Sequence, residues 1–294
     1  MRTIALAALL VATSAAAVPP RFFLMGTGTV TIVNAHTNER ATVRYRRADG
    51  TYDPSALKTL RHLFRSRGDG AETEISLRLI EILSRLQSTA KRAELVLDSG
   101  YRSPSYNLSL KQQGRQVAGG SLHAEGLAAD LAFPRPVLRD LWMQLRALDC
   151  CGAGYYAKEG FLHIDTGRPR FWEATTSRVD ENLSAGNARL FARTEYDRYA
   201  AGEAMRVTLH ALTVPPIRVA RAARLVRDDG TSLPVRVDGD EPERDGCLEV
   251  DASGAALRIP GVPAAGRSRI ELATCAPRAE QTPETIATGP LEVE

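Results

Sequence analysis

The sequence predicts an α+β domain followed by a smaller all-β, sandwich-like domain. The first observation is a mixture of amphipathic helical segments and short strands that continues to about Trp172. The second is a series of short β-prone runs, separated by Gly, Pro and Asp turns, that begins near residue 185. The 294 residues are enough for two domains of ordinary size. We therefore expect one domain over residues 18–180 and a second over 185–294.

The N-terminus has the order of a secretory signal. Arg2 precedes an apolar run, and small residues follow up to Ala17. This run is too short to span a bilayer, and no later stretch approaches the ~18 apolar residues that a membrane helix needs. We expect residues 1–17 to be a signal peptide and the mature chain to be periplasmic, without a transmembrane segment.

Composition indicates an ordinary soluble protein. The net charge of +3 is too small to argue for a nucleic-acid partner. Four cysteines are consistent with an oxidising compartment, and Cys247 and Cys275 are placed to staple two strands. The adjacent Cys150 and Cys151 are expected to be buried thiols, because a bond between neighbours closes a strained ring. No CxxC pair occurs, so the cysteines are poor metal ligands.

Local patterns predict the elements of the first domain. Residues 28–46 read as a β-hairpin around a polar turn. Asp53 and Pro54 predict the start of a helix, whose apolar residues recur at helical spacing. After a break with two glycines, the same patterns predict, in chain order, a helix over 75–87, a strand over 94–98, a helix over 103–113, a strand over 126–133, a helix over 136–149 and a strand over 160–167.

Short β-prone runs predict the second domain. They lie at 187–194, 204–212, 220–228, 232–239, 246–252, 255–261 and 268–274. The tail over 282–294 is either a final strand or a frayed end. From Ala200 to Glu294 there is no Phe, Trp or Tyr, and so no aromatic platform for a sugar. We expect a spacer or a contact surface for an envelope protein partner, not a glycan reader.

Two histidines and one aspartate form the candidate metal site. His123 and Asp130 lie six residues apart, and Gly126 can form the turn that returns Asp130 to His123. His163, on a predicted strand, can supply a third side chain. Two imidazoles and one carboxylate leave the fourth position of a tetrahedral zinc open for water. On spacing alone, a buried structural histidine is the alternative for either imidazole.

Three motifs carry a resemblance to a known family: SGYRSPSYN, SLHAEGLAADL and GAGYYAKEGFLHIDTG. In this order they resemble the zinc-dependent D-Ala-D-Ala peptidases and murein endopeptidases, the LAS metallopeptidases. Within that family the chain looks most like the exported MepK-type endopeptidases. The resemblance covers about residues 28–173. It implies a domain with a central antiparallel sheet, one zinc ion per chain, and peptidoglycan stem peptides as substrate.

The resemblance also implies a role for each matching residue. His123, Asp130 and His163 match the three zinc ligands of the family. Arg102 matches the loop arginine that faces the substrate's carboxylate or carbonyl, a task that suits a planar fork of donors. Ser121 matches the serine at the head of the second motif, a hydrogen-bonding group at the substrate cleft.

The general base is not defined by the motif. Many relatives carry Glu or His two or three residues before the third ligand, where this chain has Gly160 and Phe161. Asp165 is favoured as the base because it shares a strand face with His163. Glu159 is the second candidate for the base. The alternative for Asp165 is a carboxylate that orients a ligand histidine.

These residues predict an exported zinc metallopeptidase that hydrolyses amide bonds in peptidoglycan cross-links. The zinc would polarise the scissile carbonyl while its water attacks. The ligand set also accepts other divalent ions. A D,D-carboxypeptidase that trims stem peptides is an alternative within enzymes. A non-catalytic cell-wall binding or scaffold protein that retains the fold is the alternative from another class.

Overall fold

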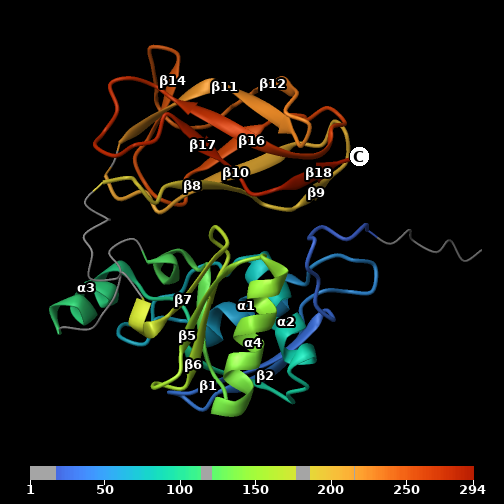
Figure 1. The fold of residues 1–294 in the computed structure, drawn as a ribbon, viewed down its shortest axis with the longest axis vertical. Coiled ribbons are helices and arrows are strands. Elements are labelled where there is room, and N and C mark those ends of the chain that lie inside the picture. Colours follow the sequence, from blue (N-terminus) through green and yellow to red (C-terminus); the bar gives the residue numbers. More distant parts are fainter. Residues whose placement is uncertain (1–17, 114–120, 177–185, 215) are drawn as a thin grey trace, which may run out of the picture.

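The computed structural model describes residues 18–113, 121–176, 186–214 and 216–294. The expected signal peptide and the boundary near residue 180 lie outside these residues. Figure 1 shows two parts that lie against each other, an α/β region (residues 18–176) and a β region (residues 186–294). Within the described part of the chain, no helix is long and apolar enough to cross a membrane.

The α/β region contains four α-helices, two short 3-10 helices and seven strands among its described residues. The helices are α1 (Pro54–Leu63), α2 (Leu77–Thr89), α3 (Pro104–Gln112), α4 (Arg135–Leu148), η1 (Leu122–Glu125) and η2 (Ala174–Thr176). The strands are β1 (Thr29–Asn34), β2 (Arg40–Arg44), β3 (Leu95–Ser99), β4 (Ala128–Ala132), β5 (Gly152–Tyr156), β6 (Phe161–Asp165) and β7 (Arg170–Glu173).

The seven strands form one mixed sheet in the order β2-β1-β3-β4-β6-β5-β7. The central strands β3, β4, β6 and β5 pair antiparallel, in agreement with the expected central antiparallel sheet. The expectation of an antiparallel sheet is too simple at both sides, because β1–β3 and β5–β7 are parallel pairs. Parallel pairing needs a crossover connection. It is supplied by β2, α1 and α2 in the first case and by β6 in the second.

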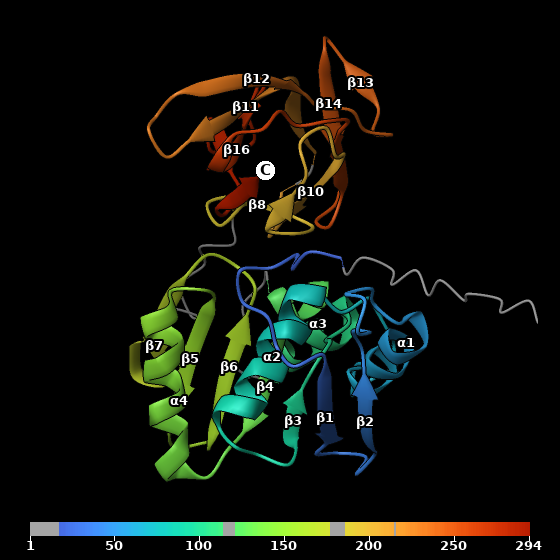
Figure 2. The same ribbon diagram turned by 90° about the vertical axis from the view of Figure 1, so that its right-hand side faces the viewer.

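Helices cover one face of this sheet and leave the other face for the site. In Figure 2, α2 and α4 lie in front of the sheet. Alternate residues such as Ala129 and Leu131 of β4 and Leu162 of β6 are buried in the core with these helices. Because successive strand residues point to opposite faces, Asp130 and His163 lie on the side away from α2 and α4.

The predicted helices are confirmed, and a capping side chain marks the start of α1 and of α3. The carboxylate of Asp53 accepts hydrogen bonds from the backbone N–H groups of Ser55 and Ala56, which begins α1. Two strands were not predicted, β5 and β7. β5 contains two glycines and β7 has only four residues, so neither shows a clear alternation of apolar and polar residues.

The β region contains eleven strands among its described residues. They are β8 (Phe191–Thr194), β9 (Arg198–Tyr199), β10 (Met205–His210), β11 (Ile217–Arg227), β12 (Ser232–Arg236), β13 (Glu243–Arg244), β14 (Cys247–Val250), β15 (Ala256–Ile259), β16 (Gly266–Thr274), β17 (Thr285–Ala287) and β18 (Leu291–Val293). A three-stranded sheet, β15-β10-β8, and an eight-stranded sheet built on β11 and β16 share one buried core. The C-terminal tail forms two of these strands.

Cysteine chemistry differs between the two regions. Cys247, on β14, and Cys275, which follows β16, form a disulfide. Cys150 and Cys151 are free thiols, and Cys151 is buried.

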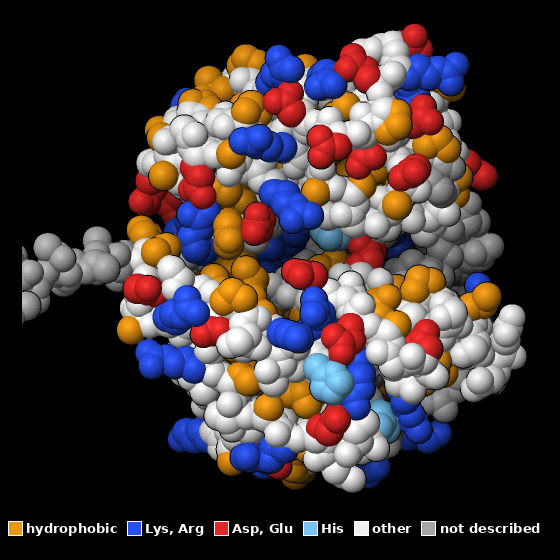
Figure 3. Space-filling model, turned by 180° about the vertical axis from the view of Figure 1, so that it is seen from behind, with side chains coloured by type: hydrophobic (Ala, Val, Ile, Leu, Met, Phe, Trp, Pro, Cys, Tyr) orange, Lys and Arg blue, Asp and Glu red, His pale blue; other side chains and the backbone are white. Residues whose placement is uncertain are grey.

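On the face drawn in Figure 3, acidic and basic side chains are interspersed over both regions, in keeping with the small net charge.

Candidate metal centre

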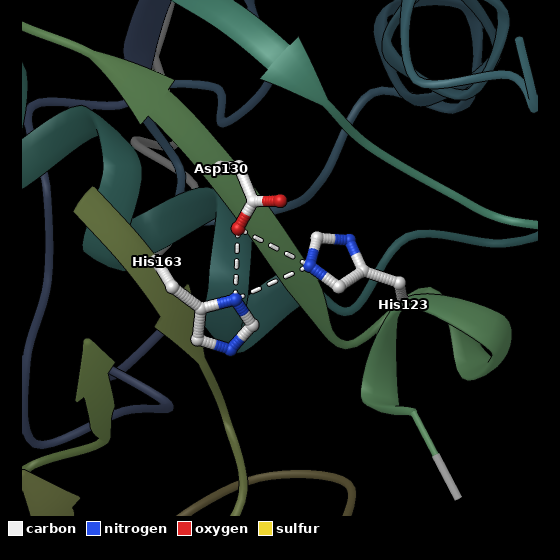
Figure 4. Close-up of side chains that lie close together, drawn as sticks. All are labelled: His123, Asp130 and His163. Atoms are coloured by element: carbon white, nitrogen blue, oxygen red, sulfur yellow. Dashed lines mark hydrogen bonds and ion pairs between the residues drawn. The ribbon is translucent and has the colours of Figure 1, made fainter. Parts of the chain in front are cut away.

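Three side chains converge on the open face of the sheet. His123 comes from η1, Asp130 from β4 and His163 from β6, and Figure 4 shows their polar atoms pointing toward one another. Asp130 and His163 are direct partners in the β4–β6 pairing. Gly126 ends η1 with a φ of +68°, in the left-handed region that favours glycine. This turn lets the chain enter β4 with Asp130 beside His123.

The spacing of these three side chains suits a metal ion. Nδ1 of His163 lies 2.8 Å from Oδ1 of Asp130 and 3.2 Å from Nε2 of His123. Nε2 of His123 lies 3.3 Å from the same carboxylate oxygen. Zinc bonds of about 2.0–2.1 Å at tetrahedral angles place ligand atoms about 3.3 Å apart. The three atoms therefore need only small adjustments to bind one zinc ion.

Neighbouring acceptors fix which nitrogen of each histidine faces the centre. Nδ1 of His123 donates to the carbonyl oxygen of Gly100 at 2.7 Å. Nε2 of His163 donates to Oδ2 of Asp165 at 2.9 Å. The nitrogen that remains on each ring then presents a lone pair to the other two ligand atoms. Such acceptors behind ligand histidines are typical of metal sites.

The electrostatics of the cluster favour a positive charge at its centre. Burial lowers the pKa of His163, but its hydrogen bonds to Asp130 and Asp165 outweigh burial and raise that pKa to about 9. Burial and the charge of Arg102 lower the pKa of His123. Burial alone would raise the pKa of Asp130, yet both imidazoles hold it well below its usual range. A proton or a metal ion satisfies the same three acceptor atoms.

Asp165 lies behind His163 and is fully buried. Besides His163, its carboxylate accepts the backbone N–H of Gly167 at 2.8 Å and two guanidinium N–H groups of Arg170 at 2.8 and 3.0 Å. Gly152, opposite Asp165 on β5, leaves the space for this carboxylate, because a Cβ there would lie 2.4 Å from Oδ2. Both oxygens of Asp165 are thus engaged with neighbouring groups.

Arg102 contacts the ligand set directly. Its Nη2 donates to Oδ2 of Asp130 at 2.5 Å, and its Nε donates to Oγ of Ser99 at 2.9 Å. Its backbone N–H donates to the carbonyl oxygen of His123 at 3.1 Å. Arg102 therefore fixes the carboxylate oxygen that does not face the two histidines. Ser121 is half-buried at the start of η1, two residues before His123.

A pocket of about 400 Å³ opens beside the centre on the β1–β3 side. Its lining residues include Asp130, Phe161 and three arginines, Arg65, Arg67 and Arg102. Glu159 is exposed in the turn between β5 and β6, two residues before Phe161.

On the other side of the centre lies Trp172, which the sequence placed only at the edge of the domain. Its ring centroid is 5.3 Å from that of His163. Gly154 of β5 pairs with both His163 and Trp172, and a Cβ at Gly154 would lie 2.5 Å from the indole. The glycine thus leaves room for the indole beside the ligand.

Several residues of the site were not predicted. Ser99, Gly154 and Trp172 belong to the same cross-strand row as Asp130 and His163, which is visible only once the strand order is known. The strand order was not available from the sequence, because β5 and β7 have no clear β pattern.

An open sheet face with two imidazoles and one carboxylate in mutual contact defines a metal-binding site of the kind used by zinc hydrolases. Residues 25–172 match the family model described as peptidoglycan L,D-endopeptidase MepK. The chain belongs to this family of peptidoglycan endopeptidases, within the LAS zinc peptidases, so the predicted family and its enzymatic class are confirmed.

Individual relatives agree with the family model. The peptidoglycan L,D-endopeptidase MepK of Escherichia coli is 34% identical over 146 residues, which cover 49% of this chain and 79% of the relative. The probable peptidoglycan L,D-endopeptidase MepK of Haemophilus influenzae is 31% identical over 146 residues, 49% of this chain and 78% of the relative. No solved structure matches the chain significantly. The family match ends at residue 172 and does not include the β region.

Proposed function

We propose that this chain is a zinc-dependent endopeptidase that hydrolyses L,D amide bonds in peptidoglycan peptide cross-links. The proposal rests on one observation above all: two imidazole nitrogens and one carboxylate oxygen face one another at 2.8–3.3 Å on the sheet face next to a pocket. Membership of the MepK family and the names of the relatives support the choice of bond.

In this proposal His123, Asp130 and His163 hold the zinc ion. Zinc, when bound, supplies a Lewis acid that polarises a carbonyl and makes a nearby water more acidic. Each ligand is oriented by a group of the chain itself: His123 by the carbonyl of Gly100, and Asp130 by Arg102. His163 is the most exposed of the three, with 15% of its side chain accessible.

The contacts of Asp165 support the orienting role over the role of general base. A base must have a free oxygen within reach of the proton that it takes. Both oxygens of Asp165 accept hydrogen bonds, and one of them holds Nε2 of His163 on the side away from the other ligands. We therefore propose Asp165 as a positioning residue, and Glu159 stays the candidate base.

The pocket is the proposed binding place of the substrate peptide. Arg65, Arg67 and Arg102 line it, against the carboxylates of Asp98 and Asp130. Arg67 is exposed, with its Nη1 3.4 Å from Nε2 of His36, whereas Arg65 pairs with Glu39. We propose that Arg102 fixes Asp130 and also faces the substrate.

Two further assignments complete the proposal. Ser121 contributes a hydroxyl at the end of the cleft. Export through residues 1–17 brings the enzyme to the periplasm, with the peptidase domain over 18–180 and the accessory domain over 185–294. The first relies on the family motif, and the second on the composition of the N-terminus and the change of pattern near residue 185.

Metal content and cleavage, measured on the same preparation, test the proposal. We expect about one zinc per mature chain, and new peptide fragments when the chain is incubated with purified peptidoglycan. Chelation and the substitution His163→Ala are both expected to abolish cleavage. His62→Ala is the matched control, because His62 is exposed on α1 and contacts Glu72 rather than the site.

The fragments also separate the alternatives. Their masses name the bond, since removal of a terminal residue alone would indicate a carboxypeptidase. One zinc without cleavage, together with unchanged wall binding by His163→Ala, would favour the scaffold alternative. A wild-type chain that binds no zinc would overturn the proposed function.

A further inference from the structure

The β region contacts the segment that carries the ligand His123. Oε2 of Glu125, two residues after His123 in η1, lies 2.7 Å from Nδ1 of His210, and its Oε1 accepts the backbone N–H of Ala211 at 3.0 Å. Both carboxylate oxygens of Glu125 are therefore held by the β region. Around this contact lies a small buried cluster that joins the two regions; it consists of Leu122, Leu127, Ala128, Phe191 and Ala211.

A second contact holds the segment that follows the ligand His163. Arg193, on β8, donates from Nε and Nη2 to the carbonyl oxygen of Thr166 at 2.9 and 2.7 Å, and from Nη2 to that of Gly167 at 2.7 Å. Gly289 leaves the space for this guanidinium, because a Cβ there would lie 2.4 Å from Nη1. Arg193 is thus fitted between its own region and the turn after β6.

This second contact connects to the metal centre through a short chain of hydrogen bonds. Arg193 holds the carbonyl of Gly167, and the N–H of Gly167 donates to Oδ1 of Asp165 at 2.8 Å. Oδ2 of Asp165 in turn accepts from Nε2 of His163. A shift of the Thr166–Gly167 turn would therefore change the direction in which His163 presents Nδ1.

Other contacts between the regions do not end on the segments next to His123 and His163. Arg78 of α2 forms a buried ion pair with Asp197, and Arg198 donates to the carbonyl oxygen of Phe22. The contacts of Arg193 and Glu125 differ from them because they end on the segments next to two ligands, on the side of the α/β region that faces the β region in Figures 1 and 2.

We propose that the β region is a positioning element of the metal centre, acting through Arg193 on the Thr166–Gly167 turn and through His210 and Ala211 on Glu125. This inference rests on the proposed function for its metal. Groups that orient ligands from behind contribute about 10–100-fold to metal affinity or activity. The β region thereby has a role in the zinc chemistry although it supplies no zinc ligand.

The test uses the full-length mature chain with Arg193→Met, which keeps the length of the side chain and removes its donors. Arg193→Lys restores one donor group. Arg198→Met is the matched control, an arginine of the same region that donates to the carbonyl oxygen of Phe22 in the α/β region but not to a segment next to a ligand. For each variant, thermal unfolding reports folding, competition with a chelator gives the zinc affinity, and the visible spectrum of bound Co²⁺ reports ligand geometry.

We expect Arg193→Met to fold, to bind zinc at least tenfold more weakly than the wild type and to change the spectrum of bound Co²⁺. The zinc affinity of Arg193→Lys is expected to lie between those of Arg193→Met and the wild type. Arg198→Met is expected to have the zinc affinity and the Co²⁺ spectrum of the wild type. Wild-type affinity and spectrum in folded Arg193→Met would overturn the inference, as would an equal loss in Arg198→Met. If Arg193→Met does not fold, the same two measurements are made on Glu125→Gln, and wild-type zinc affinity and Co²⁺ spectrum in that variant would overturn the inference. These readouts do not require cleavage, so a wild type that binds metal without cutting peptidoglycan contradicts the proposed function alone.

Discussion

At the scale of single residues, Asp165 has two possible roles that predict different measurements. If it orients His163, Asp165→Asn weakens a charge-assisted hydrogen bond behind a ligand, and zinc affinity falls about 10–100-fold. If it is the general base, zinc affinity is kept and the turnover number falls about 10²–10⁴-fold. We expect the first result, measured by chelator competition and by initial rates at saturating zinc. Asp140→Asn, on the exposed side of α4, is the control.

The three residues of the candidate centre could be chosen from the sequence, but the orientation of their side chains could not. His123, Asp130 and His163 stand in short motifs, and strand alternation already places Asp165 on the same side of β6 as His163. Which nitrogen of His163 faces the centre depends on Asp165, Gly167 and Arg170 together. The sequence predicts that Arg102 faces the substrate, but it does not predict the hydrogen bond from Arg102 to Asp130. That contact depends on how the loop after β3 folds back onto β4.

At the scale of elements, β5 leaves room for the site because two of its residues are glycines without a side chain. Gly152 and Gly154 face the site, where a Cβ would meet the carboxylate of Asp165 at 2.4 Å or the indole of Trp172 at 2.5 Å. We expect Gly152→Ala to displace Asp165, and so to lower zinc affinity at least tenfold by chelator competition. Gly154→Ala is the comparison, because it displaces Trp172 and leaves the Asp165–His163 hydrogen bond in place.

An equal effect on zinc affinity in both glycine variants would contradict this explanation and indicate a general loosening of the sheet.

The same glycines explain why the sequence did not reveal β5. Glycine weakens strands by its entropy and adds no side chain to the period-2 pattern. The helices, in contrast, have clear start signals at Asp53 and Ser103, whose side chains accept backbone N–H groups as capping residues do.

The disulfide stabilises the β region at a distance from the site. Cys247 and Cys275 close a loop with a sequence separation of 28. Loss of such a cross-link costs about 3.6 kcal/mol by the chain-entropy model. We expect the double variant Cys247→Ser, Cys275→Ser to lower the urea midpoint of unfolding accordingly. Zinc affinity is expected to stay unchanged, because β14 lies on the side of the β region away from the α/β region (Figures 1 and 2). A loss of zinc affinity in a folded double variant would contradict this separation.

At the scale of the whole molecule, the sequence predicted two regions but not how one contacts the other. The β-prone runs are recognisable in the sequence, but no neighbouring residue in the sequence indicates a role for His210. Its partner, Glu125, is 85 residues away in the chain. Contacts of this kind depend on how two surfaces dock. Hydrophobic periodicity predicts local secondary structure and carries no information about such docking.

Zinc should stabilise the whole chain and not only the site, because its ligands lie on η1, β4 and β6 and the β region docks next to two of them. A ligand that binds only the folded state adds about 4 kcal/mol when its free concentration is 1,000 times its dissociation constant. We expect chelation to lower the midpoint of thermal unfolding of the mature chain, and readdition of zinc to restore it. The midpoint of His163→Ala should not respond to either. If zinc shifts His163→Ala as much as the wild type, the stabilising ion binds elsewhere on the molecule.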